Sequence, residues 1–182
     1  MISETIKSIR DFVGTQGKLP AYAPAEEQVI PQVERDLGFP LPELLRHCYL
    51  EIGNGGNGPG YGVIGVKGGY ASDYGDLVET YHVSKQDQEL LDLEWPNTML
   101  PFSECGCNIY SRVDCSSADQ RVYTFQDSSL TAQAYSIAKF FDHWIHGISI
   151  LDYQSDGMVE TVIVNPFNND KARISKRQKR GT

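Results

Sequence analysis

The sequence has 182 residues and lacks any apolar run near the roughly 20 residues that a membrane-spanning helix needs. Its start, MISETIKSIR, also lacks the hydrophobic stretch of a secretory signal peptide. We therefore expect a soluble, cytoplasmic protein. With a mass of 20.3 kDa and 40% hydrophobic residues, the chain is long enough for one buried core and short for two, so a single domain is predicted.

Cysteine is scarce, and the spacing of the four cysteines does not match a zinc site. Cys105, Cys107 and Cys115 lie in CGCNIYSRVDC, without the two-residue spacing that paired zinc ligands usually have. Cys48 falls on the apolar face of a predicted helix, where it fits a small buried thiol. We expect unpaired thiols in a reducing compartment, with no metal and no cofactor.

Catalytic motifs are missing as well. The glycine-rich run NGGNGPGYG at 54–62 has neither the Lys-Ser/Thr ending of a P-loop nor a helix directly after it, so it is interpreted as a structural turn. His47 and Cys48 are adjacent in a helix and point about 100° apart, which does not suit a base and its nucleophile. His143 and His146 have the spacing of two metal ligands, but we interpret them as solvent-facing. The sequence predicts a protein that is not an enzyme, with a hydrolase as the least favoured alternative.

Acidic residues outnumber basic ones over most of the chain. The formal net charge is −8, yet the final KARISKRQKRGT holds six bases and no acid, which leaves residues 1–170 with 10 bases, 24 acids and a net charge of −14. Such a body repels nucleic acid and attracts basic partners. The tail at 168–182 is predicted to be disordered, and it can contact nucleic acid or fold back on the acidic body.

The hydrophobic pattern predicts a mixture of helices and strands. Helices are predicted within 2–13, 25–37, 42–52, 73–88 and 136–147, and strands at 61–67, 108–113, 121–125 and 161–164. The turn-rich DCSSADQ joins the second and third strands as a hairpin. Pro31 is expected to begin the second helix or to kink it. No element is predicted at 95–106, where two prolines break the periodicity.

The order of these signals resembles the SUKH superfamily, which groups the fungal Smi/Knr cell-wall regulators with many bacterial immunity proteins. The residues that carry the resemblance span about 25–147 and stand in this order: Leu37-Gly38 after an acidic helix, Leu41-Pro42 before the next helix, Tyr49 before Asn54-Gly55-Gly56, Leu100-Pro101-Phe102 before Gly106 and Asn108, and Phe140, Phe141 and Trp144 in a late helix.

The resemblance implies an α+β fold, in which a single domain has a curved, largely antiparallel sheet flanked by helices. We place this domain at 1–167, with its core at 25–147. In bacteria the resemblance implies an immunity protein that binds and neutralises a cognate protein toxin by occlusion, and the acidic body suggests a basic, nuclease-like toxin. The alternative is an intracellular scaffold or regulatory protein-interaction module, as the fungal members suggest. The oligomeric state stays open.

An acidic surface with aromatic side chains is the predicted recognition face for this partner. Tyrosine buries a large area at a small entropic cost, and acids steer a basic partner. The alternative is a solvated face that contacts nothing. The predicted partner-binding residues lie in or before the helix at 73–88, in the loop after it, and on or beside the hairpin: Asp73, Tyr74, Asp76, Glu79, Glu104, Tyr110, Asp114, Asp119 and Asp127.

Overall fold

The computed structural model describes residues 2–15, 22–91, 95–126, 129–148, 150, 158–164 and 171–177. Its helices are α1 (Ile2–Thr15), α2 (Val29–Leu37), α3 (Glu43–His47), which continues as the π-helical turn η1 (Cys48–Ile52), α4 (Leu77–Leu90) and α5 (Ile137–Ile145). Its strands are β1 (Gly62–Val63), β2 (Met99–Gly106), β3 (Ile109–Asp114), β4 (Arg121–Gln126), β5 (Ser129–Ser136), β6 (Met158–Val164) and β7 (Lys171–Arg177).

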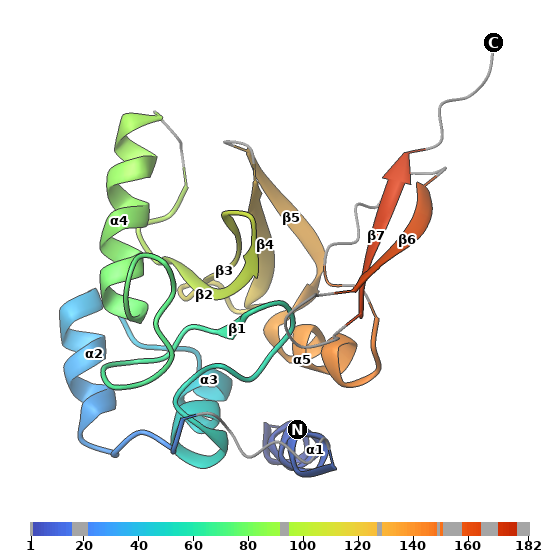
Figure 1. Cartoon of the computed structure of the whole chain (residues 1–182). Coiled ribbons are helices and arrows are strands. Elements are labelled where there is room, and N and C mark those ends of the chain that lie inside the picture. The colour runs from blue at the N-terminus through green and yellow to red at the C-terminus, as the bar shows by residue number, and fades with distance from the viewer. Residues whose placement is uncertain are drawn as a thin grey trace.

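The first five strands form one antiparallel sheet in the order β1-β2-β3-β4-β5, and β6 pairs only with β7 among the described strands. The sheet is curved, with α2 and α4 along one side, α3 below β1, and α5 beneath the ends of β4 and β5 (Figure 1). The predicted α+β class, with a largely antiparallel sheet flanked by helices, is confirmed.

The predicted helices are present, with one correction at Pro31. Pro31 neither begins nor kinks α2, because the helix starts at Val29 and places the proline in its first turn. An N–H in the first turn has no partner within the helix, so its loss costs little there. The helix ends as the sequence predicts, at Gly38, whose φ of 83° is left-handed and whose N–H donates to the Glu34 carbonyl.

The absence of an element at 95–106 is a wrong prediction, since β2 occupies Met99–Gly106. Pro101 is tolerated because the pairing of β2 with β3 shifts register between Pro101 and Ser103. In addition, β1 reaches only Ser103 and Glu104 on the other edge of β2, so no strand needs the missing N–H. The sequence also gives no signal for β5, whereas the hairpin of β3 and β4 is confirmed.

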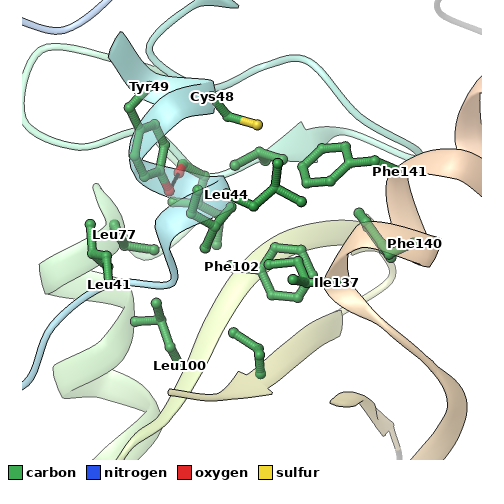
Figure 2. Close-up of a cluster of buried hydrophobic side chains, with 14 of the residues drawn as sticks. Leu41, Leu44, Cys48, Tyr49, Leu77, Leu100, Phe102, Ile137, Phe140 and Phe141 are labelled. Atoms are coloured by element: carbon green, nitrogen blue, oxygen red, sulfur yellow. Dashed lines mark hydrogen bonds between the residues drawn. The ribbon is translucent and has the colours of Figure 1, made fainter. Parts of the chain in front are cut away.

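The core joins the central helix to the sheet and to α5. Leu44, Cys48 and Tyr49 belong to one buried cluster with Phe102 of β2 and with Phe140 and Phe141 of α5, and the Cys48 sulfur points toward Phe141 (Figure 2). Tyr49 is fully buried, and its hydroxyl donates to the Ile64 carbonyl at 2.7 Å. The Phe102 and Phe140 rings meet edge to face with centroids 4.9 Å apart. These contacts fix the middle of β2, from which the candidate site extends.

The glycine loop after η1 is a structural turn, as the sequence predicts. Gly55 has a φ of 80°, and a Cβ at this position would lie 2.5 Å from the Gly65 backbone nitrogen. Asn54 closes the loop, because its Oδ1 accepts from the Val66 N–H at 2.8 Å and its carbonyl accepts from the Tyr70 N–H at 2.9 Å. The loop thereby delivers Tyr70 to the edge of the sheet.

The C-terminal strands differ in part from the sequence-based expectation. β6 contains the predicted strand at 161–164, but Lys171–Arg177 forms β7 inside the segment predicted as a disordered tail. Apolar residues at 172 and 174 alternate with basic and polar ones, a period-2 pattern that favours a strand. The domain boundary at 167 stays a prediction.

Among the described residues, no helix has both the length and the apolar character needed to cross a membrane.

Candidate functional site

Two predicted tyrosines and two predicted acids come together beside the start of α4. We call Tyr70, Asp73, Tyr74, Glu104 and Tyr110 the tyrosine–carboxylate face. The first three belong to the loop before α4, Glu104 lies near the end of β2, and Tyr110 lies near the start of β3, directly opposite Glu104 in the sheet. Asp73 and Tyr74 are exposed, whereas Glu104 and Tyr110 are buried beneath them.

Two of the three tyrosines of this face, Tyr74 and Tyr110, form an aromatic wall. The rings of Tyr74 and Tyr110 stack with centroids 6.0 Å apart and an angle of 29° between their planes. The Tyr74 hydroxyl donates to Asn108 Oδ1 at 3.1 Å, which ties the loop before α4 to the β2–β3 turn. Tyr74 nevertheless keeps 38% of its surface exposed, so its ring is held in place and is open to a partner.

Glu104 is a buried carboxylate with no cationic partner among the described residues. It is 4% exposed, its Oε2 accepts from the Tyr70 hydroxyl at 3.3 Å, and no ion pair joins it to a basic side chain of the described residues. Burial raises the pKa of Glu104, and the nearby charge of Asp73 raises it further, against the lowering effect of the Tyr70 hydrogen bond. The site therefore holds negative charge that the described part of the chain does not neutralise.

Two further predicted residues, Asp76 and Glu79, hold the loop that carries Tyr74. The Asp76 carboxylate accepts from the N–H groups of Val78 and Glu79 at 3.0 and 3.1 Å. The Glu79 carboxylate accepts in return from the Asp76 N–H at 2.9 Å. This capping box starts α4 and fixes the exit of the loop. Both acids have a structural task, and neither belongs to the tyrosine–carboxylate face.

The remaining predicted residues lie elsewhere. Asp114 is at the far end of β3, where it accepts from Thr98 Oγ1 at 2.6 Å and from the Ser116 N–H at 3.0 Å. Burial alone would raise the pKa of Asp114, but these hydrogen bonds outweigh it and lower the pKa. Asp119, in the β3–β4 turn, pairs with Arg121 at 3.3 Å. Asp127 lies outside the described residues.

A pocket next to the face contains a residue that the sequence analysis did not single out. It lies between α4 and strands β3 and β4 and opens to solvent. Its lining residues are Tyr74, Thr80, Ser84, Asp87, Asn108, Tyr110, Arg112 and Phe125. Arg112 is 3% exposed, and its guanidinium carbon lies 5.0 Å from the Trp95 ring centre and 4.9 Å from that of Phe125. The sequence could have indicated Arg112, because it lies two residues after Tyr110 in a predicted strand and the two side chains therefore share one face of the sheet.

The histidines and cysteines do not form a second site in the described part of the chain. No group of three or more His, Cys, Asp and Glu side chains there has an arrangement suited to a metal ion. His146 is exposed and pairs with Asp142 at 3.1 Å, whereas His143 is half-buried against the Tyr135 ring, so only His146 faces solvent as predicted. Burial raises the pKa of Cys48 to about 12, of Cys105 to about 11 and of Cys115 to about 12.

The fold and the site together define a class of protein: an α+β domain in which the end of β2, the start of β3 and the loop before α4 form a face of tyrosines and carboxylates. The chain belongs to the SMI1/KNR4 family (SUKH-1), whose family model matches residues 24–147. The resemblance inferred from the sequence over about 25–147 is thereby confirmed. No curated protein matches the chain closely enough to be named as a relative. The family includes toxin immunity proteins, and its members typically bind protein partners and are typically not enzymes.

Proposed function

We propose that this protein is an immunity protein that binds a cognate protein toxin through the tyrosine–carboxylate face and blocks the active site or substrate surface of that toxin. The observation that carries the proposal is the buried carboxylate of Glu104, which has no ion pair within the described residues. An acid that is nine-tenths buried usually has a cationic partner. A basic side chain of the toxin is the partner that this face lacks.

The surroundings of Glu104 suit a lysine or arginine from a basic, nuclease-like toxin. The exposed ring of Tyr74 offers its face to the stem or the charge of such a side chain. Burial raises the pKa of Tyr70 and of Tyr110, and the charge of Glu104 raises both further, so the two hydroxyls stay neutral hydrogen-bonding groups. The net charge of −14 over residues 1–170 adds long-range steering.

The proposal is tested by co-expression with the toxin encoded beside this gene, followed by purification and a growth assay. We expect a stable complex and survival of the host. Glu104→Gln removes the buried charge while keeping the side-chain volume, and it should weaken binding about tenfold or more, in line with the loss of one buried interface charge pair. Asp11→Asn is the matched control, because Asp11 is exposed on α1 and its loss changes the net charge equally. The absence of any bound or neutralised neighbouring product would refute the proposal.

The second candidate function is that of an intracellular scaffold or regulatory module. The name of the family, SMI1/KNR4, is also consistent with this function. Gene position separates the two functions. A small gene directly after a gene for a large secreted toxin supports immunity, whereas a solitary gene supports regulation. In the second case, the tyrosine–carboxylate face would bind a basic segment of a host protein instead of a toxin.

A further inference from the structure

Arg112 is the second buried charge on the same face of the sheet. It is 3% exposed, and no ion pair joins it to a carboxylate of the described residues. Its Nη1 donates to Ser84 Oγ, but its Nε has no hydrogen-bond acceptor in the described protein. A buried N–H without an acceptor costs about 1 to 3 kcal/mol, and more when the group is charged. Arg112 Nε is therefore a buried donor for which the described part of the chain supplies no acceptor.

The walls of the pocket fix the guanidinium of Arg112 and leave its Nε edge available as a hydrogen-bond donor. Trp95 and Phe125 lie about equally far from the guanidinium carbon, at 5.0 and 4.9 Å, so the group is held by aromatic rings. A planar guanidinium held in this way is prepared for an acceptor with two oxygen atoms in its plane. The pocket is also small, which limits the ligand to one compact group with its remainder in solvent.

Asp87 is the acid that faces Arg112 across the pocket. It lines the pocket and raises the pKa of Arg112 through its charge, against the burial that lowers this pKa to about 10. The two side chains do not form an ion pair within 4.0 Å, so Asp87 does not occupy the free edge of Arg112. Asp87 would repel an anion in the pocket and attract a cation, which makes it the residue that distinguishes the two kinds of ligand.

We propose that this pocket is a carboxylate-binding subsite, in which the Nε edge of Arg112 donates hydrogen bonds to the carboxylate and the Tyr74–Tyr110 pair covers it. The carboxylate comes from an acidic side chain of a protein partner or from a free small carboxylate. The subsite stands on Arg112 and its pocket alone, and it does not depend on the partner being a toxin.

The position of the subsite adds a specificity rule to the tyrosine–carboxylate face. Glu104 lies opposite Tyr110 in the β2–β3 pairing, and Arg112 follows two residues later on β3. Side chains two residues apart on a strand share one face of the sheet. A partner that places a basic side chain on Glu104 can thus place an acidic side chain on Arg112. A partner with only basic residues would leave the Nε–H donor of Arg112 without an acceptor.

The test is a titration of the ¹⁵N-labelled full chain with sodium acetate, and with sodium chloride at the same ionic strength, followed by NMR. We expect saturable shifts with acetate, and not with chloride, at the Arg112 Nε–Hε signal and at the amides of Ser84 and Asn108. Asp87→Asn should tighten acetate binding about fivefold, because it removes a like charge from the pocket. Asp11→Asn makes the same change of net charge on α1 and should leave the affinity unchanged.

Arg112→Lys keeps the charge but lacks the planar edge, and it should abolish the saturable shift. Because Arg112 is buried, this variant can fail to fold, and the pair of Asp87→Asn and Asp11→Asn then decides the question alone. The source of the carboxylate is distinguished with the peptides acetyl-Lys-Ala-Glu-amide and acetyl-Lys-Ala-Gln-amide. Tighter binding of the first peptide than of acetate points to a protein side chain, and equal binding points to a small carboxylate. The proposal fails if acetate gives no saturable shift or if Asp87→Asn weakens its binding.

Discussion

Glu104 and Arg112 have opposite charges and are both buried. Neither forms an ion pair among the described residues, with the other or with a third side chain. Each lowers the stability of the isolated protein, because moving a charge out of water without a partner is costly. A side chain that costs stability and is held in place by tyrosines or by other aromatic rings is typical of a binding site. These two side chains therefore favour a partner that brings charges of its own.

The stability of the protein should depend on pH through Glu104. The folded-state pKa of Glu104 is raised, so ionisation of this group costs folding free energy above that pKa, and the cost vanishes below the unfolded-state pKa of about 4.3. Glu104→Gln removes the cost, and we expect it to raise the melting temperature at about pH 7.5 and to lose this advantage near about pH 4. Calorimetry at the two pH values checks this. Glu89→Gln, at an exposed position of α4, is the control, and a lower melting temperature of Glu104→Gln at pH 7.5 would contradict the prediction.

One of the four thiols should react much faster than the others in the native protein. Burial raises the pKa of Cys48, Cys105 and Cys115, which keeps them protonated, whereas Cys107 is exposed in the turn next to Asn108. We expect one rapid equivalent with a thiol reagent at neutral pH, and four after denaturation. Cys107→Ser should remove the rapid equivalent. Rapid labelling that persists in this variant would show that a second thiol is accessible.

The sequence could predict the members of the site better than their arrangement. The acidic and aromatic composition was sufficient to propose Asp73, Tyr74, Glu104 and Tyr110, which the structure brings together. It could not separate them from Asp76 and Glu79, because an N-terminal capping box and an interface are built from the same residue types. Arg112 was missed since its burial depends on rings from outside its own strand.

At the scale of elements, helices were easier to predict than strands. The apolar repeat of α1 lies within the helix, and Ile6, Ile9 and Val13 are buried as that repeat requires. The long β2 was missed, because its prolines argue against a strand when its neighbours are unknown. Only the short β1 and the register shift beside Pro101 make this strand possible, and both are products of the assembled sheet.

Two glycines with nearly equal φ allow a direct test of the glycine loop. Gly55 and Gly38 have φ values of 80° and 83°, so alanine is strained at both positions. At Gly38 an added Cβ meets nothing within 4 Å, and Gly38→Ala should cost about 1 kcal/mol of unfolding free energy. At Gly55 the Cβ would lie 2.5 Å from the Gly65 nitrogen, and Gly55→Ala should cost about 3 kcal/mol or more. Urea denaturation measures both, and equal losses would show that the close approach of the two backbones is unimportant.

At the scale of the whole molecule, residues 1–170 and the C-terminal segment at 171–182 carry opposite net charges. Residues 171–182 hold six bases and no acid, and their loss changes the net charge from −8 to −14. Among the described strands, β7 pairs only with β6, and this pair forms a sheet of its own. A two-stranded hairpin is only marginally stable alone, and among the described strands it adds no pairing to the five-stranded sheet, so we expect it to contribute little to the stability of that sheet.

Deletion of all residues after Asp170 should therefore change the melting temperature by less than about 2 °C, which corresponds to less than about 1 kcal/mol for a chain of this size. A full-length variant with glutamine at all six basic positions of the segment is the charge control, since it has the net charge of the truncated chain and keeps its length. If both proteins lose several degrees at low salt and recover at high salt, the prediction is wrong because the bases stabilise the acidic body by charge. If only the truncated chain loses several degrees, and salt does not restore it, the segment packs against the body and the prediction is wrong.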